Sequence, residues 1–217
     1  MRPSYVLFDK QSKAIVFNNQ ARAIQRMLDY DYVVQRTEPS VAAIVNPSGK
    51  GFHPAMFGHG EILIPVYTTT REAVQNHPEA DVFINFASQR SAWQTTKTAM
   101  QHPSIQTLVV IAEGMPERQA RDLSLEAKEK NKWLLGPATV GGVAAGAFKT
   151  GNSAGTIDNI VHCKLYRPGH VGFVSKSGGL SNEMYNVISR HSSGIREGIA
   201  LGGDRFPGNT ATERPSV

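Results

Sequence analysis

The sequence has 217 residues, of which 40% are hydrophobic and 19% charged, and its formal net charge is +5. This length and balance are typical of one large domain, or of one domain and part of a second. The basic residues are scattered, and neither a zinc-ligand spacing nor a basic stripe with interleaved aromatics occurs, which disfavours nucleic-acid binding. No apolar run reaches the length of a membrane span or resembles a signal peptide, so a cytoplasmic chain without membrane contact is expected.

Short runs of apolar and β-branched residues predict buried strands. Most of these runs are continuously apolar rather than alternating, which is typical of strands covered on both faces in a parallel sheet. The predicted strands are Ala14–Phe17, Val41–Val45, Ile62–Val66, Asp81–Asn85, Thr107–Ala112, Lys132–Leu135 and Val171–Val174.

Segments with helical periodicity lie between these strands. They are Asn19–Leu28, Thr70–Gln75, Ser91–Met100, Pro116–Asn131 and Ser181–Ser189. Strands that alternate with helices predict βαβ units and a doubly wound α/β fold. Five to six strands are expected before about residue 140. A glycine-rich connection follows, and a second α/β unit then begins that is too short to form a sheet of its own.

Ligands of such sheets bind at the carboxyl ends of the strands. No GxGxxG pattern follows the first predicted strand, where the sequence reads AIVFNNQARAIQ, so a nicotinamide cofactor is disfavoured. The asparagines and Gln20 there fit either a helix start that faces a phosphate or a simple capped helix. After the second strand, VNPSGKG presents Lys50 on a glycine-flanked loop. Such a lysine can bind a phosphate, although taken alone it is more typical of an exposed surface position.

Two later strands also end in small or polar residues. INFASQRSA offers small side chains that allow close approach to the backbone, together with Arg90, which can pair with a phosphate. IAEGMPE places Glu113 and Gly114 at the next strand end. Each of these strand ends is a weak signal alone, but together they indicate a binding edge.

The sharpest local pattern is VSKSGGLSNE, in which a buried strand runs through Ser177, Gly178 and Gly179 into a helix. The glycines expose backbone N–H groups, and the helix N-terminus adds positive potential, so the pattern favours an anion or phosphate site. The alternative is a capped turn with Ser177 as the cap. The segment does not match the GxSxG nucleophile elbow, so its serines are interpreted as hydrogen-bond donors.

No catalytic or metal-binding residue is predicted. None of the seven histidines stands in a helical pair suited to a metal, and all are expected to be structural or exposed. Cys163 is the single cysteine, which excludes an intrachain disulfide, and its apolar surroundings in IVHCKLY predict a core position.

Read together and in order, these segments resemble the ATP-citrate lyase family, in its smaller-subunit form, and more distantly the α subunit of succinyl-CoA synthetase. The resemblance covers about residues 13–208. It is carried by QRMLDYDY, EPSVAAIV, EILIPV, DVFINFASQRSA, IAEGMPE, GPATVGG, YRPG, SKSGGLSNE and GGDRFPG.

The resemblance implies that residues 1–150 form a Rossmann-like CoA-binding domain. Residues 151–217 would form a linker and the incomplete start of a flavodoxin-like, succinyl-CoA-synthetase-like ligase domain. The implied CoA site consists of Lys50, Phe86, Ala87, Ser88, Arg90, Ser91, Ala112, Glu113 and Gly114. The implied site for phosphate or the reacting acyl group consists of Ser177, Gly178 and Gly179.

In this family ATP, citrate and CoA give acetyl-CoA, oxaloacetate, ADP and phosphate through a phosphohistidine. The family's histidine segment is absent here, and residues 210–217, TATERPSV, depart from the family pattern. The resemblance therefore implies a chain truncated at its C-terminus and inactive alone. ATP and Mg²⁺ would bind to a larger partner subunit with ATP-grasp and lyase domains, forming a hetero-oligomer.

Three alternatives remain open at this point. One is a non-catalytic or vestigial chain that binds CoA or another subunit. Another is a fragment of a succinyl-CoA-synthetase-like acyl-CoA ligase. The third is a generic nucleotide-binding dehydrogenase, which the missing glycine pattern disfavours.

Overall fold

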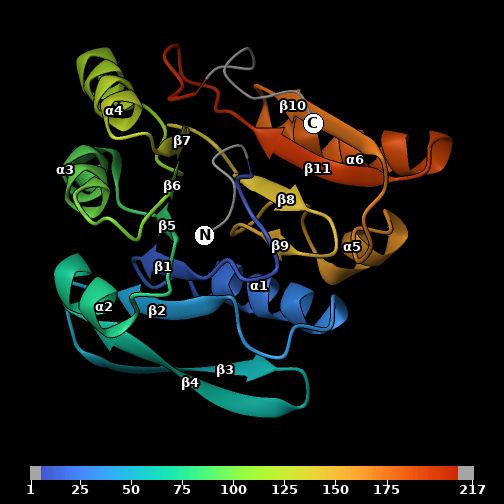
Figure 1. Ribbon diagram of the computed structural model, residues 1–217, viewed down its shortest axis with the longest axis horizontal. Coiled ribbons are helices and arrows are strands. Elements are labelled where there is room, and N and C mark those ends of the chain that lie inside the picture. The colour runs from blue at the N-terminus through green and yellow to red at the C-terminus, as the bar shows by residue number, and fades with distance from the viewer. Residues whose placement is uncertain (1–5, 210–217) are drawn as a thin grey trace.

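Two sheets organise the chain in a computed structural model that describes residues 6–209 (Figure 1). The first sheet has seven strands and the second has four. The strands of the first sheet are β1 (Ala14–Phe17), β2 (Val41–Val45), β3 (Gly51–Phe57), β4 (Gly60–Tyr67), β5 (Val82–Asn85), β6 (Thr107–Val110) and β7 (Trp133–Leu135). Its helices are α1 (Ala21–Val33), α2 (Thr70–Asn76), α3 (Gln89–Met100) and α4 (Glu117–Glu129).

The first sheet confirms the predicted α/β fold with a mostly parallel sheet. Its strand order is β3-β4-β2-β1-β5-β6-β7, and every neighbouring pair is parallel except the β3–β4 hairpin. The sheet therefore has seven strands rather than five or six before residue 140. The unpredicted strand is β3, whose Phe52 and Met56 face solvent and give no buried apolar run.

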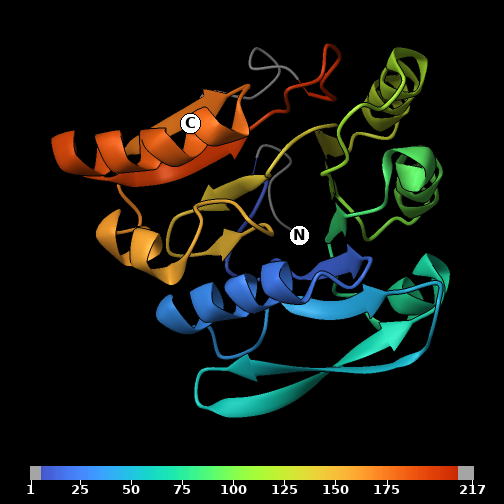
Figure 2. The same cartoon turned by 180° about the vertical axis from the view of Figure 1, so that it is seen from behind.

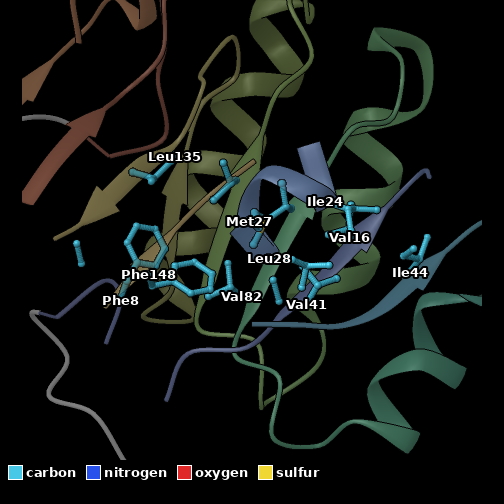
Figure 3. Close-up of a cluster of buried hydrophobic side chains, with 14 of the residues drawn as sticks. Phe8, Val16, Ile24, Met27, Leu28, Val41, Ile44, Val82, Leu135 and Phe148 are labelled. Atoms are coloured by element: carbon cyan, nitrogen blue, oxygen red, sulfur yellow. The ribbon is translucent and has the colours of Figure 1, made fainter. Parts of the chain in front are cut away.

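Alternating side chains of the central strands supply two cores, one on each face of the sheet. On one face Ile24, Met27 and Leu28 of α1 pack against the strands, as Figure 3 shows. Phe8 and Phe148 complete this core, with ring centroids 5.2 Å apart. On the other face the sheet packs against α2, α3 and α4. Burial on both faces explains why the strands are continuously apolar.

The second sheet has the order β10-β11-β8-β9. Its strands are β8 (Gly142–Ala144), β9 (Phe148–Lys149), β10 (Val171–Ser175) and β11 (Ile195–Ala200), with helices α5 (Ile157–His162) and α6 (Gly178–His191). Strands β10 and β11 are parallel, whereas β11–β8 and β8–β9 are antiparallel. Two of its strands thus come from residues 142–149, inside the stretch interpreted from sequence as a glycine-rich connection.

Helix α1 of the first sheet contacts the second sheet and its loops. The hydroxyl of Tyr30 on α1 donates to the carbonyls of Ala144 (3.1 Å) and Leu165 (2.9 Å) and accepts from Gly146 N–H (3.0 Å). After β11 the chain returns towards the first sheet, which Figure 2 shows from behind. There Gly208 N–H donates to Gly136 and Asn209 N–H donates to Leu134 of β7.

Within residues 6–209, each helix is either too short or too polar to cross a membrane.

Candidate functional site

The strand order reverses between β1 and β5, because β1 continues through β2 on one side and β5 lies on the other. Such a reversal opens a crevice at the carboxyl ends of the two strands, where ligands of doubly wound sheets bind. Asn18 spans this crevice, since its side-chain amide donates to the carbonyl of Phe86 at 3.1 Å. Phe86 N–H in turn donates to the Phe17 carbonyl at 3.1 Å.

The buried Asn85 shapes the end of β5. Its side-chain oxygen accepts from Ala87 N–H at 2.9 Å, and its amide nitrogen donates to Thr95 (2.7 Å) and Thr96 (2.9 Å) of α3. This turn delivers the chain directly into the start of α3, with Ser88 at the N-cap position.

The predicted residues around this turn differ in exposure. Ala87 is buried and Phe86 half-buried, whereas Ser88, Arg90 and Ser91 are exposed. Arg90 and Ser91 lie in the first turn of α3. The positive end of the helix and the Arg90 guanidinium therefore lie at one edge of the crevice, an arrangement that suits an anion.

Lys50 lies between β2 and β3 at the same edge of the sheet. Its side chain is 62% exposed and forms an ion pair with Glu72 of α2. The carboxylate of Glu72 raises the pKa of Lys50, so the lysine is a stable cation. An anion that binds Lys50 must therefore compete with Glu72.

The end of β6 adjoins the start of α3. Gly114 has a φ of +73°, a left-handed conformation that favours glycine, and the end of the exposed Gln89 side chain lies next to it. The Ala112 carbonyl accepts from Ala138 N–H at 2.8 Å, which joins this strand end to the segment leading into the second sheet.

The start of α6 has the geometry predicted for a capped helix. The Ser177 side chain accepts from Leu180 N–H at 3.3 Å. Gly178 and Gly179 are the first two helical residues, so their N–H groups have no intrahelical carbonyl partner and point along the helix axis. Gly178 also packs closely on Val140, because a Cβ there would lie 2.8 Å from a Val140 methyl. The cap and the capacity for anion binding are thus compatible.

A cleft of about 790 Å³ lies between the two sheets, next to the end of β6 and the start of α6. Its lining consists of Ile111, Glu113, Gly114, Ala138, Thr139, Val140, Lys176, Ser177, Gly178, Gly179, Gly203 and Asp204. The structure therefore brings together five of the predicted residues, namely Glu113, Gly114, Ser177, Gly178 and Gly179. The other predicted residues lie outside this lining: Lys50, Phe86, Ala87, Ser88, Arg90, Ser91 and Ala112.

Two charged residues of the cleft were not predicted from sequence. Lys176 adds a cation beside the start of α6, and Asp204 adds a carboxylate. One oxygen of Asp204 is buried without a hydrogen-bond partner within residues 6–209. Both residues stand in segments noted in the sequence, SKSGG and GGDRFPG, but only the folded sheets show that they share a cleft.

The remaining chemistry-bearing residues are structural in character. Cys163 is buried, and burial raises the pKa of its thiol, which does not suit a nucleophile. Several histidines bond to neighbouring side chains, for example His77 to Tyr67 at 3.1 Å. Within the described part of the chain, three or more His, Cys, Asp or Glu residues nowhere gather in a way that could hold a metal ion.

Comparison with known proteins places this geometry in context. No family model matches the chain. A probable ATP-citrate synthase of Dictyostelium discoideum is 59% identical over 95% of this chain, which spans 33% of that relative. ATP-citrate lyase of Methanothrix soehngenii, solved in complex with citrate and coenzyme A, superimposes with a TM-score of 0.97 at 55% identity over 98% of this chain and 34% of that chain. The chain is homologous to one third of ATP-citrate synthase.

Other ATP-citrate synthases are also similar to this chain over most of its length. The ATP-citrate synthase of Bos taurus is 53% identical over 95% of this chain, which spans 19% of that protein. In these relatives the matching segment is therefore part of a longer polypeptide. A dinucleotide-forming acetyl-coenzyme A synthetase from Ca. Korarchaeum cryptofilum superimposes with a TM-score of 0.61 at 16% identity, covering 90% of this chain and 39% of that chain, and shows a shared fold only. The predicted family and fold class are both confirmed.

Proposed function

We propose that this chain is the CoA-binding part of an ATP-citrate lyase. CoA would lie along the carboxyl edge of the first sheet, and its reacting end would reach the cleft between the sheets. The observation that carries this proposal is the cleft itself, because it places the end of β6, at Glu113 and Gly114, against the start of α6. A ligand along the predicted edge would then meet an anion-binding helix terminus at one end.

The charges along this path fit CoA, which is a long anion with phosphates near one end. Lys50 and Arg90 are exposed cations at the ends of β2 and β5, where they would bind phosphates of the nucleotide portion. Between them the half-buried Phe86 would form an apolar wall, with the small, buried Ala87 next to it. At the other end the N–H groups of Gly178 and Gly179, with Lys176 nearby, would stabilise a phosphate or an acyl group that develops negative charge.

The reaction to which this site would contribute consumes ATP, citrate and CoA and forms acetyl-CoA, oxaloacetate, ADP and phosphate. The structure solved with citrate and coenzyme A, and a second solved with (3S)-citryl-CoA, support this substrate class. ATP and Mg²⁺ would be bound by other parts of the enzyme. These parts would belong to a larger partner subunit, and the complex would be a cytoplasmic hetero-oligomer.

Calorimetric titration of the chain with CoA, dephospho-CoA and NAD tests the proposal. CoA should bind, dephospho-CoA should bind more weakly if Lys50 or Arg90 contacts the 3′-phosphate, and NAD should not bind. Lys50→Ala and Arg90→Ala should each weaken CoA binding, while Arg121→Ala on the outer helix α4 serves as a charge-matched control. A folded chain that binds NAD as tightly as CoA would contradict the proposal.

A further inference from the structure

Lys149, the last residue of β9, is unusual because it is a lysine with only 1% of its surface exposed. Lysine is rarely buried to this degree without an ionic partner. Within residues 6–209 its ammonium forms no salt bridge, and Nζ donates one hydrogen bond, to the Gly151 carbonyl at 2.7 Å. Burial lowers the pKa of Lys149 to about 7, with Arg26, Asp29 and Asp31 of α1 as its charged neighbours.

The loop that accepts this hydrogen bond, residues 150–155, is fixed from other sides as well. Gly142 N–H donates to the Thr150 hydroxyl at 2.7 Å, and the Ser153 hydroxyl donates to the Gly142 carbonyl at 2.9 Å. On the side of α1, Arg26 donates to Asn152 Oδ1 at 3.1 Å. The loop is thus held between β8 and α1, and Lys149 supports Gly151 from within.

Gly151 connects this loop to the crevice of the first sheet. Its φ is +41°, and a Cβ built there would lie 3.1 Å from Cζ of Phe86. The aromatic ring therefore rests directly on the glycine backbone. Phe86 is the residue whose carbonyl accepts from Asn18 across the β1–β5 crevice.

We propose that Lys149 is a positioning residue for the CoA site, because it fixes Gly151 and Gly151 in turn fixes the Phe86 ring at the crevice. This inference rests on the proposed function for its ligand, but its structural step stands on the contacts alone. One hydrogen bond and one van der Waals contact separate the buried amine from the aromatic wall. Removing the amine therefore takes away the support of Gly151 and loosens the ring, while the bonds at Thr150, Asn152 and Ser153 still hold the rest of the loop.

Lys149→Met tests this step, since methionine keeps much of the volume and removes the donor. Backbone hydrogen exchange of the 217-residue chain should become about tenfold faster within 150–155, and CoA should bind about tenfold more weakly, the size expected for one lost buried hydrogen bond. Lys149→Gln retains an N–H donor, so its increase in exchange and its loss of CoA affinity should both be smaller than those of Lys149→Met. Gly151→Ala should weaken CoA binding with Lys149 intact, because the added Cβ displaces Phe86.

Lys132→Met is the matched control. Lys132 is also partly buried and donates to a backbone carbonyl, that of His102 at 2.6 Å, but it lies beside β7 rather than at the crevice. Equal effects from Lys132→Met, or unchanged exchange and CoA affinity in Lys149→Met, would overturn the inference. Should Lys149→Met fail to fold, Lys149→Gln and Gly151→Ala test the inference instead, and unchanged CoA affinity in both would overturn it. If the wild-type chain does not bind CoA but Lys149→Met still speeds exchange within 150–155, the proposed function fails while the positioning step is supported.

Discussion

The side-chain amide of Asn18 donates to the Phe86 carbonyl at 3.1 Å and so joins the ends of β1 and β5 where the strand order reverses. Asn18 has a φ of +68°, a left-handed conformation that asparagine tolerates better than most residues. One residue thus supplies both the turn that leads into α1 and the bridge across the crevice.

Asn18→Ala should lower the free energy of unfolding by about 1–2 kcal/mol, because it removes this bond and leaves alanine in a left-handed conformation. CoA binding should weaken as well, since Phe86 loses one anchor. Urea denaturation and calorimetry check the two effects. Asn19→Ala is the control, because Asn19 is exposed and its side chain bonds to His53 at the surface; an equal loss in both variants would count against the bridge.

Glu72→Gln should increase the affinity for CoA a few-fold, because Glu72 pairs with Lys50 and competes with an incoming phosphate. The gain should shrink as salt is added, since an exposed ion pair is screened. Titrations at low and high salt measure this, with Glu79→Gln as a charge-matched control. No gain at low salt would show that Lys50 does not contact the ligand.

Stability should rise with pH between about 7 and 8.5. The pKa of Lys149 is lowered from its ordinary 10.5 to about 7, so above pH 7 the unfolded chain binds a proton that the folded chain has lost. Lys132, with a pKa of about 8, acts with the same sign at the upper end of this range. Urea denaturation at both pH values should show the rise, and Lys149→Met should reduce it. An unchanged pH dependence in that variant would show that Lys149 does not titrate in this range.

Gly178 and Gly179 should respond differently to alanine. A Cβ on Gly178 would lie 2.8 Å from a Val140 methyl, so Gly178→Ala should displace the start of α6 and destabilise the chain. At Gly179 the nearest atom, Ser177 Oγ, is 3.9 Å away, and Gly179→Ala should be neutral or stabilise the helix by up to about 1 kcal/mol. Thermal unfolding separates the two; equal destabilisation would mean that the contact with Val140 is unimportant.

The sequence predicts the central strands well, since β1, β2, β5 and β6 are covered on both faces and read as unbroken apolar runs. Strands β8 and β9 give no such signal, because they have three and two residues and β8 pairs with β11, some 50 positions along the chain.

In the candidate site, too, local patterns are predicted from the sequence and long-range contacts are not. The start of α6 is a local pattern and is predicted, whereas Lys176 and Asp204 share a cleft only through long-range packing. Nothing in the sequence around Lys149 distinguishes it from an exposed surface lysine, and only the packing of β9 on α1 shows that it is buried. The roles of Lys50 and Arg90 in phosphate binding remain predictions.

The chain crosses between the two sheets twice, outward after β7 at Gly136 and back again at Gly208 and Asn209, which bond to Gly136 and Leu134. These two crossings lie side by side, and away from them the second sheet is held on α1 by the Tyr30 hydroxyl and by a core shared with the first sheet, to which Phe148 and Ile199 belong. Opening the cleft would break these contacts, so we expect a ligand to enter a preformed cleft without a large movement of the two sheets.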